Sequence, residues 1–120
     1  MKFREITSKS GKKILAGKDD ESNEELVNLY LRKANMILHT AKPGSPFCVI
    51  EGKASKQDIK EAGVFCAKYS QAWKKASRKA DVEVHVFSGK DVYKCKGMKT
   101  GTFGVKKHKK IIVKKSEVEG

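Results

Sequence analysis

The sequence has few cysteines, few prolines and no long apolar run. Its 120 residues include three cysteines, an odd number, and no two of them have the CxxC spacing. We therefore expect neither a disulfide framework nor a zinc site, and we expect a reducing, cytoplasmic setting. Only two prolines and no low-complexity tract are present, which argues against a disordered chain.

The apolar stretches fall far short of the roughly 20 residues that span a bilayer. The N-terminal segment Met1–Ile6 lacks the apolar region of a signal peptide. No helical segment combines a basic face with a large exposed apolar face, which binding to a membrane surface requires. We therefore expect no membrane partner.

Motifs for catalysis and for small ligands are also missing. Ser45 lies in the segment Pro43–Pro46, which lacks the second glycine of a nucleophile elbow. The glycine-rich segment 97–104 contains no phosphate-binding motif. The acids at 19–21 lack the glycine and the distal glutamate of a calcium loop. The sequence predicts no enzyme, no metal ion, no cofactor and no small-molecule substrate.

Positive charge is what the sequence has in excess. It contains 27 Lys+Arg against 14 Asp+Glu, a formal net charge of +13 at pH 7. Residues 53–79 carry eight basic and two acidic side chains, and residues 90–115 carry ten lysines and one aspartate. Such a charge destabilises a compact domain by self-repulsion, and a phosphate backbone is the commonest partner that offsets it. A merely solvated basic surface is the alternative interpretation.

Two segments have the apolar periodicity of helices. The first is expected to be capped by Ser22 or Asn23 and to extend to Ala34. The second begins with a capping box formed by Ser55 and Asp58 and is expected to end near residues 76–79. Its aromatic stripe is predicted to lie in the core and comprises Phe65, Tyr69 and Trp73.

The remaining segments read as strands and turns. In the strand at 82–87, valines alternate with Glu83, His85 and Phe87, which indicates one buried face. Residues 106–110 are expected to form the tip of a C-terminal hairpin, and residues 116–120 a frayed tail after a domain at 1–115. Further strands are predicted at residues 2–7, 12–17, 35–40, 46–50, 91–95 and 111–113.

These elements predict the α+β class. We expect a single domain with an antiparallel or mixed β-sheet, two main helices and terminal hairpins. The length of the chain and its 38% hydrophobic residues suit one domain with one core.

Five segments occur in an order typical of one known family. They are Gly17–Leu26 (similar to GRNxxxNexL), Ala34–Thr40 (aDiWfHa), Pro43–Pro46 (pGSH), Ala62–Ala72 (AAxlAayySxa) and Gly97–Val105 (kpkgapGxv). These motifs resemble those of the NFACT-R (NFACT RNA-binding) domain family over residues 10–114. The chain departs from the family pattern at four positions: Asn35 for an aspartate, Ile37 and Leu38 for aromatic residues, and Pro46 for a histidine.

The resemblance implies an RNA-binding module. Long members of the family act on stalled large ribosomal subunits in ribosome-associated quality control and recognise tRNA. The present chain resembles only the R domain, so we expect a stand-alone version. Its expected partner is structured RNA, either tRNA or ribosomal RNA, including RNA on the large ribosomal subunit.

Two groups of residues are predicted to bind RNA. The first group, which the resemblance places around one strand–loop–strand unit, comprises His39, Lys42, Gly44 and Ser45. The second group supplies phosphate contacts and comprises Lys94, Lys96, Lys99, Lys106, Lys107, Lys109 and Lys110. Only three of the basic residues are arginines, so recognition of backbone and shape is favoured over reading of sequence.

Two other functions are open at this point. A protein–protein adaptor would use the basic face to bind an acidic partner protein. A DNA-binding module is the third interpretation, because backbone charge alone does not distinguish DNA from RNA.

Overall fold

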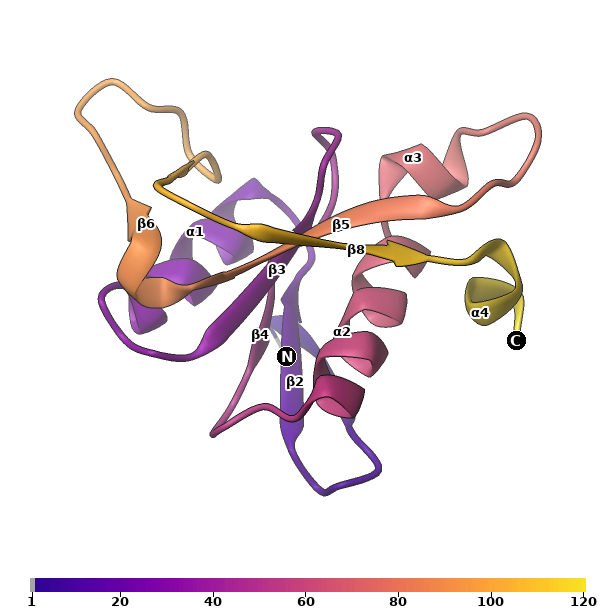
Figure 1. Ribbon diagram of the computed structural model, residues 1–120. Helices are drawn as coiled ribbons and strands as arrows, with labels where there is room; N and C mark the ends of the chain where they lie inside the picture. Colours follow the sequence, from indigo (N-terminus) through magenta and orange to yellow (C-terminus); the bar gives the residue numbers. More distant parts are fainter. Residues whose placement is uncertain (1) are drawn as a thin grey trace.

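The centre of the molecule is a six-stranded sheet with the strand order β1-β2-β4-β3-β5-β8 (Figure 1). The computed structural model describes residues 2–120, and within them every strand pairing is antiparallel. The six strands are β1 (Phe3–Thr7), β2 (Lys13–Gly17), β3 (Met36–Thr40), β4 (Cys48–Ile50), β5 (Val82–Ser88) and β8 (Lys109–Val113).

Helices and a second small sheet complete the domain. The helices are α1 (Asp20–Tyr30), α2 (Lys56–Lys68), α3 (Gln71–Lys74) and α4 (Lys115–Glu119), with the 3-10 turn η1 (Gly89–Asp91). Strands β6 (Val92–Tyr93) and β7 (Gly104–Val105) pair with each other outside the main sheet. The predicted α+β class, with two main helices, is confirmed.

The two long helices cover opposite faces of the sheet (Figure 1). Alternate strand residues such as Leu38 and Val84 join a core with Phe65 of α2. The intervening residues, such as Ile37, join a second core with Leu26 of α1, so the expectation of one core is wrong. This division follows from the strand period of two, which sends neighbouring side chains to opposite faces.

Helix α1 begins earlier and ends sooner than the sequence predicted. Its cap is Asp19, whose carboxylate accepts a hydrogen bond of 2.8 Å from the Ser22 N–H. Ser22 and Asn23, the expected caps, lie buried in the first turn instead. The helix stops at Tyr30 rather than Ala34, and two residues later Arg32 has a φ of 67°, which helical backbone excludes.

The second helix is also shorter than expected. It starts at the predicted capping box of Ser55 and Asp58 but ends at Lys68, because Ser70 is extended and caps the separate helix α3. Phe65 is buried in the core as predicted. Tyr69 at the end of α2 and Trp73 on α3 are only partly buried and pack against this core. Of the predicted aromatic stripe, only Phe65 is buried.

The C-terminal part of the structure differs from the sequence-based predictions in three further ways. No hairpin tip forms at residues 106–110, because β7 pairs with β6 whereas β8 pairs with β5. The strand expected at 91–95 is reduced to the two residues of β6. Where we expected a frayed tail, residues 115–119 form α4, which an ion pair of 2.7 Å between Lys60 and Glu117 ties to α2.

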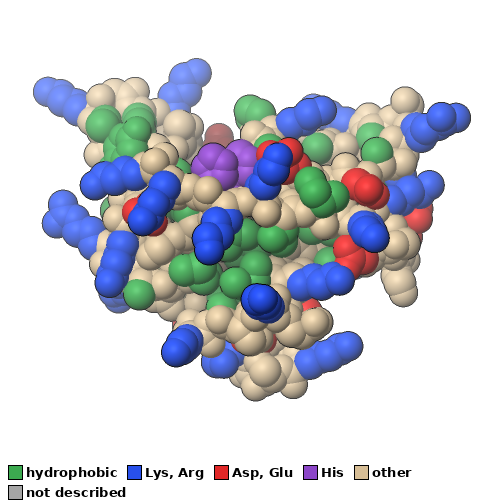
Figure 2. Space-filling view, viewed as in Figure 1, with side chains coloured by type: hydrophobic (Ala, Val, Ile, Leu, Met, Phe, Trp, Pro, Cys, Tyr) green, Lys and Arg blue, Asp and Glu red, His purple; other side chains and the backbone are tan. Residues whose placement is uncertain are grey.

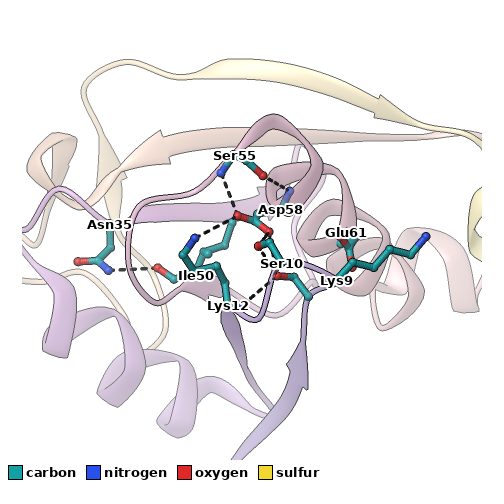
Figure 3. Close-up of polar contacts among 9 residues, drawn as sticks. Lys9, Ser10, Lys12, Asn35, Ile50, Ser55, Asp58 and Glu61 are labelled. Carbon is teal, nitrogen blue, oxygen red and sulfur yellow. Dashed lines mark hydrogen bonds and ion pairs between the residues drawn. The ribbon is translucent and has the colours of Figure 1, made fainter.

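A buried carboxylate joins the first hairpin to α2 (Figure 3). The Asp58 carboxylate is fully buried and accepts hydrogen bonds from the hydroxyls of Ser8 and Ser10 at 2.8 and 2.6 Å. It also accepts the Ser55 N–H at 2.9 Å, and the Lys12 ammonium lies 3.8 Å away. The Ser10 hydrogen bond and the other donors hold the pKa of Asp58 well below its usual range.

Replacing Asp58 should therefore destabilise the fold. We expect Asp58→Asn to lower the melting temperature by about 5 °C or more, because Asn offers one acceptor where several donors converge. Because the folded pKa is depressed, the stabilisation is complete above about pH 4 and is lost as the pH falls through the folded value. Thermal melts of both proteins between pH 2 and 7 measure both effects.

Glu119→Gln, an exposed carboxylate in the last turn of α4, is the matched control and should leave the melting temperature unchanged. Equal melting temperatures for Asp58→Asn and the parent protein at pH 7 would contradict the stabilising role of the buried carboxylate.

Candidate nucleic-acid interface

Helix α1 covers only part of its sheet face, and three strands continue beyond it. On β3, His39 follows the buried Ile37 by two residues, so both side chains point to the α1 side. In the register of the sheet, His39 lies opposite His85 of β5, and His85 lies opposite Lys110 of β8. One row of side chains therefore crosses three strands: His39, His85 and Lys110.

Other side chains extend this row into a surface. Glu83 lies opposite Ile112 one step along the same face, and Ile112 is 53% exposed. The His108 ring stacks on the His85 ring, with centroids 3.9 Å apart and an interplanar angle of 20°. Figure 2 shows histidine side chains at the surface with lysine or arginine side chains nearby. We call this surface the histidine face and define it by His39, Glu83, His85, His108, Lys110 and Ile112.

Aromatic rings support the histidine face from below. The ring centroids of His39 and Phe47 lie 4.4 Å apart, and those of Phe47 and Phe103 lie 5.7 Å apart. Phe47 is buried, so it fixes the position of the half-buried His39 ring. The face therefore combines ordered ring surfaces with a lysine at its edge.

The protonation state of His39 follows from its surroundings. Its Nδ1 lies 2.8 Å from the carbonyl oxygen of Thr40, and a carbonyl only accepts, so Nδ1 carries the hydrogen. Burial and the charge of His85 lower the pKa of His39, while the Thr40 carbonyl opposes this shift. At pH 7 the ring is therefore neutral, and its Nε2 is a hydrogen-bond acceptor.

The lysines predicted to bind RNA lie on different parts of the surface. Lys110 lies on the histidine face, whereas Lys109 lies opposite Val86 and points to the α2 side. Lys106 and Lys107 are exposed in the segment that enters β8. Lys42 is exposed just after β3, in the loop that follows His39.

Lys94 already has several protein partners. Its ammonium group donates hydrogen bonds to Glu24 at 2.9 Å and to the carbonyls of Lys99 and Thr102 at 2.6 and 2.7 Å. It also lies 4.7 Å from the centroid of the Phe103 ring. Lys94 thus fastens the loop 95–103 to α1, and this loop presents the exposed side chains of Lys96 and Lys99.

Gly44 and Ser45 shape the loop between β3 and β4. Ser45 is buried, and its hydroxyl accepts the Thr40 N–H at 3.0 Å and donates to the Pro46 carbonyl at 3.1 Å. Gly44 has a φ of +93°, and a Cβ there would lie 2.8 Å from the Gln71 side chain. Its carbonyl accepts the Gln71 N–H at 2.7 Å, so the loop rests on α3.

A second polar spot, lined by three basic and two acidic residues, lies beside this loop. A polar pocket of about 220 Å³ is lined by Gly44, Gln71, Lys74 and other residues. At its edge the Arg4 guanidinium lies 4.2 Å from the centroid of the Tyr69 ring. Sequence reasoning did not single out Arg4, because Arg4 and Tyr69 are far apart in the sequence and no local pattern shows that they are in contact.

Sequence reasoning also did not single out His85 and His108 of the histidine face, or Phe47 beneath it. The alternation at 82–87 places His85 on the face opposite the valines, which is a signal that could have identified it. The same alternation placed Phe87 on an open face, but Phe87 is buried under α1. The stacking of His108 on His85 depends on the pairing of β8 with β5, which no local pattern shows.

Asn35, which stands where the family pattern has an aspartate, forms a hydrogen bond through its side chain. Its side-chain Nδ2 donates a hydrogen bond of 3.1 Å to the Ile50 carbonyl (Figure 3). A carboxylate in this position would have no hydrogen to donate. Asn35 therefore links the start of β3 to the end of β4.

Residues 2–120 offer neither a cluster of metal ligands nor a helix suited to cross a membrane. No group of three or more His, Cys, Asp or Glu side chains there is placed to hold a metal ion. None of the helices in this range has the length and apolar character needed to cross a membrane.

Comparison with known proteins links the chain to one family. Residues 2–107 match the family model described as "NFACT protein RNA binding domain". The chain is 33% identical over 64 residues to the archaeal Rqc2 homolog aRqcH of Methanocaldococcus jannaschii. This match covers 51% of the chain and 10% of that relative, so the chain spans a small fraction of the relative's length.

A solved structure has the same fold. It is the C-terminal part of the fibronectin/fibrinogen-binding protein from Streptococcus suis, with a TM-score of 0.84. The match covers 99% of the chain and 48% of that structure at 22% sequence identity. The similarity therefore concerns the fold alone.

The shifted pKa of His39 gives a direct test of the interface geometry. We expect the His39 imidazole to titrate below about 6.5, the value of an unperturbed histidine, because burial disfavours its charged form. An NMR titration of the assigned imidazole signals measures this, with a histidine in an unstructured peptide as the reference. A His39 midpoint at or above the reference value would contradict the neutral, buried ring.

Proposed function

Because the chain belongs to the NFACT protein RNA-binding domain family, we propose that it binds structured RNA, a tRNA or a ribosomal RNA. We further propose that it does so in translation or ribosome-associated quality control, the setting indicated by its resemblance to the Rqc2 homolog. In this proposal the domain is a non-catalytic binding module.

The observation that carries the proposed location is the row of His39, His85 and Lys110 on an uncovered sheet face. RNA modules commonly stack bases on rings that stand on a sheet, with lysines beside them for the phosphates. The stacked rings of His85 and His108 offer such a surface, and Lys106, Lys107 and Lys110 surround it with charge.

His39 contributes a hydrogen-bond acceptor to this surface. Its Nδ1–H is held by the Thr40 carbonyl, so only Nε2 is available to a ligand. The 2′-hydroxyl of a ribose can donate to that nitrogen, whereas a deoxyribose has no such group. The neutral His39 ring therefore favours RNA over DNA in our proposal.

The kind of positive charge indicates how the RNA is recognised. The arginines Arg4, Arg32 and Arg78 lie outside the histidine face, whose cationic neighbours are lysines. Lysine acts as a point charge and lacks the bidentate geometry with which arginine reads guanine. We propose recognition of backbone and shape, with Lys42, Lys96 and Lys99 as peripheral phosphate contacts.

Replacing four lysines in β8 and in the segment that precedes it should weaken binding to all RNA sequences about equally. If about four lysines each neutralise one phosphate, the logarithm of affinity should fall with the logarithm of salt at a slope near −3, at roughly 0.7 per contact. We expect changing Lys106, Lys107, Lys109 and Lys110 to Gln to flatten this slope for a tRNA and for an unrelated RNA hairpin alike. Fluorescence anisotropy across a salt series measures it.

The matched control changes four exposed lysines elsewhere, Lys9, Lys53, Lys68 and Lys75, to Gln. Both variants lose the same net charge, so a general loss of attraction would affect them equally. A flat salt response in the parent protein would reject phosphate binding. Equal flattening in both variants would reject the location of the interface.

A further inference from the structure

A groove with an apolar floor runs along β8 on the α2 side of the sheet. It has a volume of about 800 Å³. Its floor includes Met36, Ile59, Val86 and Ile111. The charged residues of its lining are Lys56, Lys60, Lys107, Lys109, Lys110, Asp91 and Glu117, and the rings of Phe87 and His108 also line it. Figure 2 shows this arrangement as hydrophobic surface near the centre of the view with basic side chains on several sides. We call it the β8 groove.

Strand β8 offers an open edge beside this groove. Within residues 2–120 it pairs only with β5, at the end of the strand order, and it lies at the front of Figure 1. The Glu83 carbonyl accepts the Ala41 N–H, so the backbone groups of Glu83 face away from β8. Backbone direction alternates along a strand, and Val84 therefore faces β8 and bonds with Ile111.

The same alternation leaves two residues of β8 with outward backbone groups. Lys110 and Ile112 stand between the residues that bond with β5, so their N–H and C=O groups point away from the sheet. An extended chain laid antiparallel or parallel to β8 can pair with these groups. Alternate side chains of that chain would enter the β8 groove.

The charged side chains and the apolar floor of the β8 groove together indicate which kind of ligand it would bind. Five lysines against two acids leave the lining positively charged even though Lys60 is paired with Glu117, so the groove attracts carboxylates. Its apolar floor takes apolar side chains. Met36 adds a flexible, polarisable side chain that adapts to different shapes. Two rings line the groove, but Phe87 is buried and His108 stacks on His85. A nucleobase would therefore meet mainly aliphatic side chains, and its polar edges would lose water without gaining partners.

A second copy of the chain is a poor occupant. Six lysines lie between residues 106 and 115, and pairing two β8 edges would bring both sets together. Like charges placed in this way oppose association. We therefore propose that the edge of β8 and the β8 groove bind an extended acidic segment of a partner protein by strand addition, a function that goes beyond RNA binding.

The test uses a defined probe. The probe is a fluorescein-labelled peptide of four Glu-Val repeats, in which carboxylates and apolar side chains alternate. Fluorescence anisotropy gives its affinity, and ¹⁵N NMR locates it. We expect saturable binding, with amide shifts confined to β8 and to the other residues that line the β8 groove.

Two pairs of variants test the two parts of the site. Ile112→Pro removes an outward N–H without removing a bond to β5 and should weaken peptide binding by about three- to tenfold, whereas Ile112→Ala keeps the N–H. Lys56→Gln removes a rim charge and should weaken binding by about two- to fivefold, whereas Lys68→Gln changes an exposed lysine at the other end of α2. Thermal melts confirm that each variant is folded.

The outcomes separate this proposal from the RNA proposal. Lys56→Gln should reduce peptide affinity and leave tRNA affinity unchanged, since Lys56 lies outside the histidine face. Equal binding of a polyglutamate peptide, or equal affinities of Lys56→Gln and Lys68→Gln, would overturn strand addition in the groove. Shifts of the β8 groove amides caused by oligouridine but not by the peptide would assign the groove to RNA. Concentration-dependent shifts of β8 in the free protein would assign it to a second copy.

Discussion

Helix α1 is too short to cover the sheet face on which it packs, and the surface chemistry of the domain follows from this mismatch. Its 11 residues make a rod of about 16 Å, whereas the seven residues of β5 extend for about 23 Å. Beneath the helix the face carries Ile37 and Phe87, which are buried. Beyond it the face carries His39 and His85, whose rings keep part of their surface in solvent.

Strand β8 divides one run of lysines between two surfaces. The alternation of side chains sends Lys110 to the face of His39 and Lys109 to the opposite, α2 face, and Lys110 also borders the β8 groove. A sequence that appears uniformly basic thus builds two surfaces of different chemistry, one with exposed histidine rings and one with a mainly aliphatic floor. In our account the first binds RNA and the second an acidic protein segment, and both are organised by the pairing of β8 with β5.

Local patterns in the sequence predicted the elements whose causes are local. The capping box of Ser55 and Asp58 and the alternating valines of β5 are examples, because a cap and a buried strand face leave marks within a few residues. The predicted C-terminal end of α2 was wrong because the apolar helical pattern continues past Ser70, whereas the backbone does not. Ser70 is extended and caps a new helix, α3. The partner of β8 was wrong because β7 is nearer in sequence while β5 is nearer in space.

The candidate site shows the same limit. His39 and Lys110 were predicted separately, and only the register of three strands shows that they share one row. Ser45 and Lys94, which were predicted as contacts, form hydrogen bonds with Thr40 and Glu24 that organise their loops, and their contact with RNA stays a prediction. A sequence motif identifies residues that matter without distinguishing those that touch a ligand from those that hold a loop.

The most direct test of the central claim is to observe the histidine rings while RNA binds. In a ¹³C-labelled protein titrated with a tRNA, we predict that the imidazole signals of His39, His85 and His108 shift or broaden together, in proportion to the bound fraction. If the tRNA binds at the same affinity measured by anisotropy while all three imidazole signals stay unchanged, the histidine face is not the RNA interface and the account is contradicted.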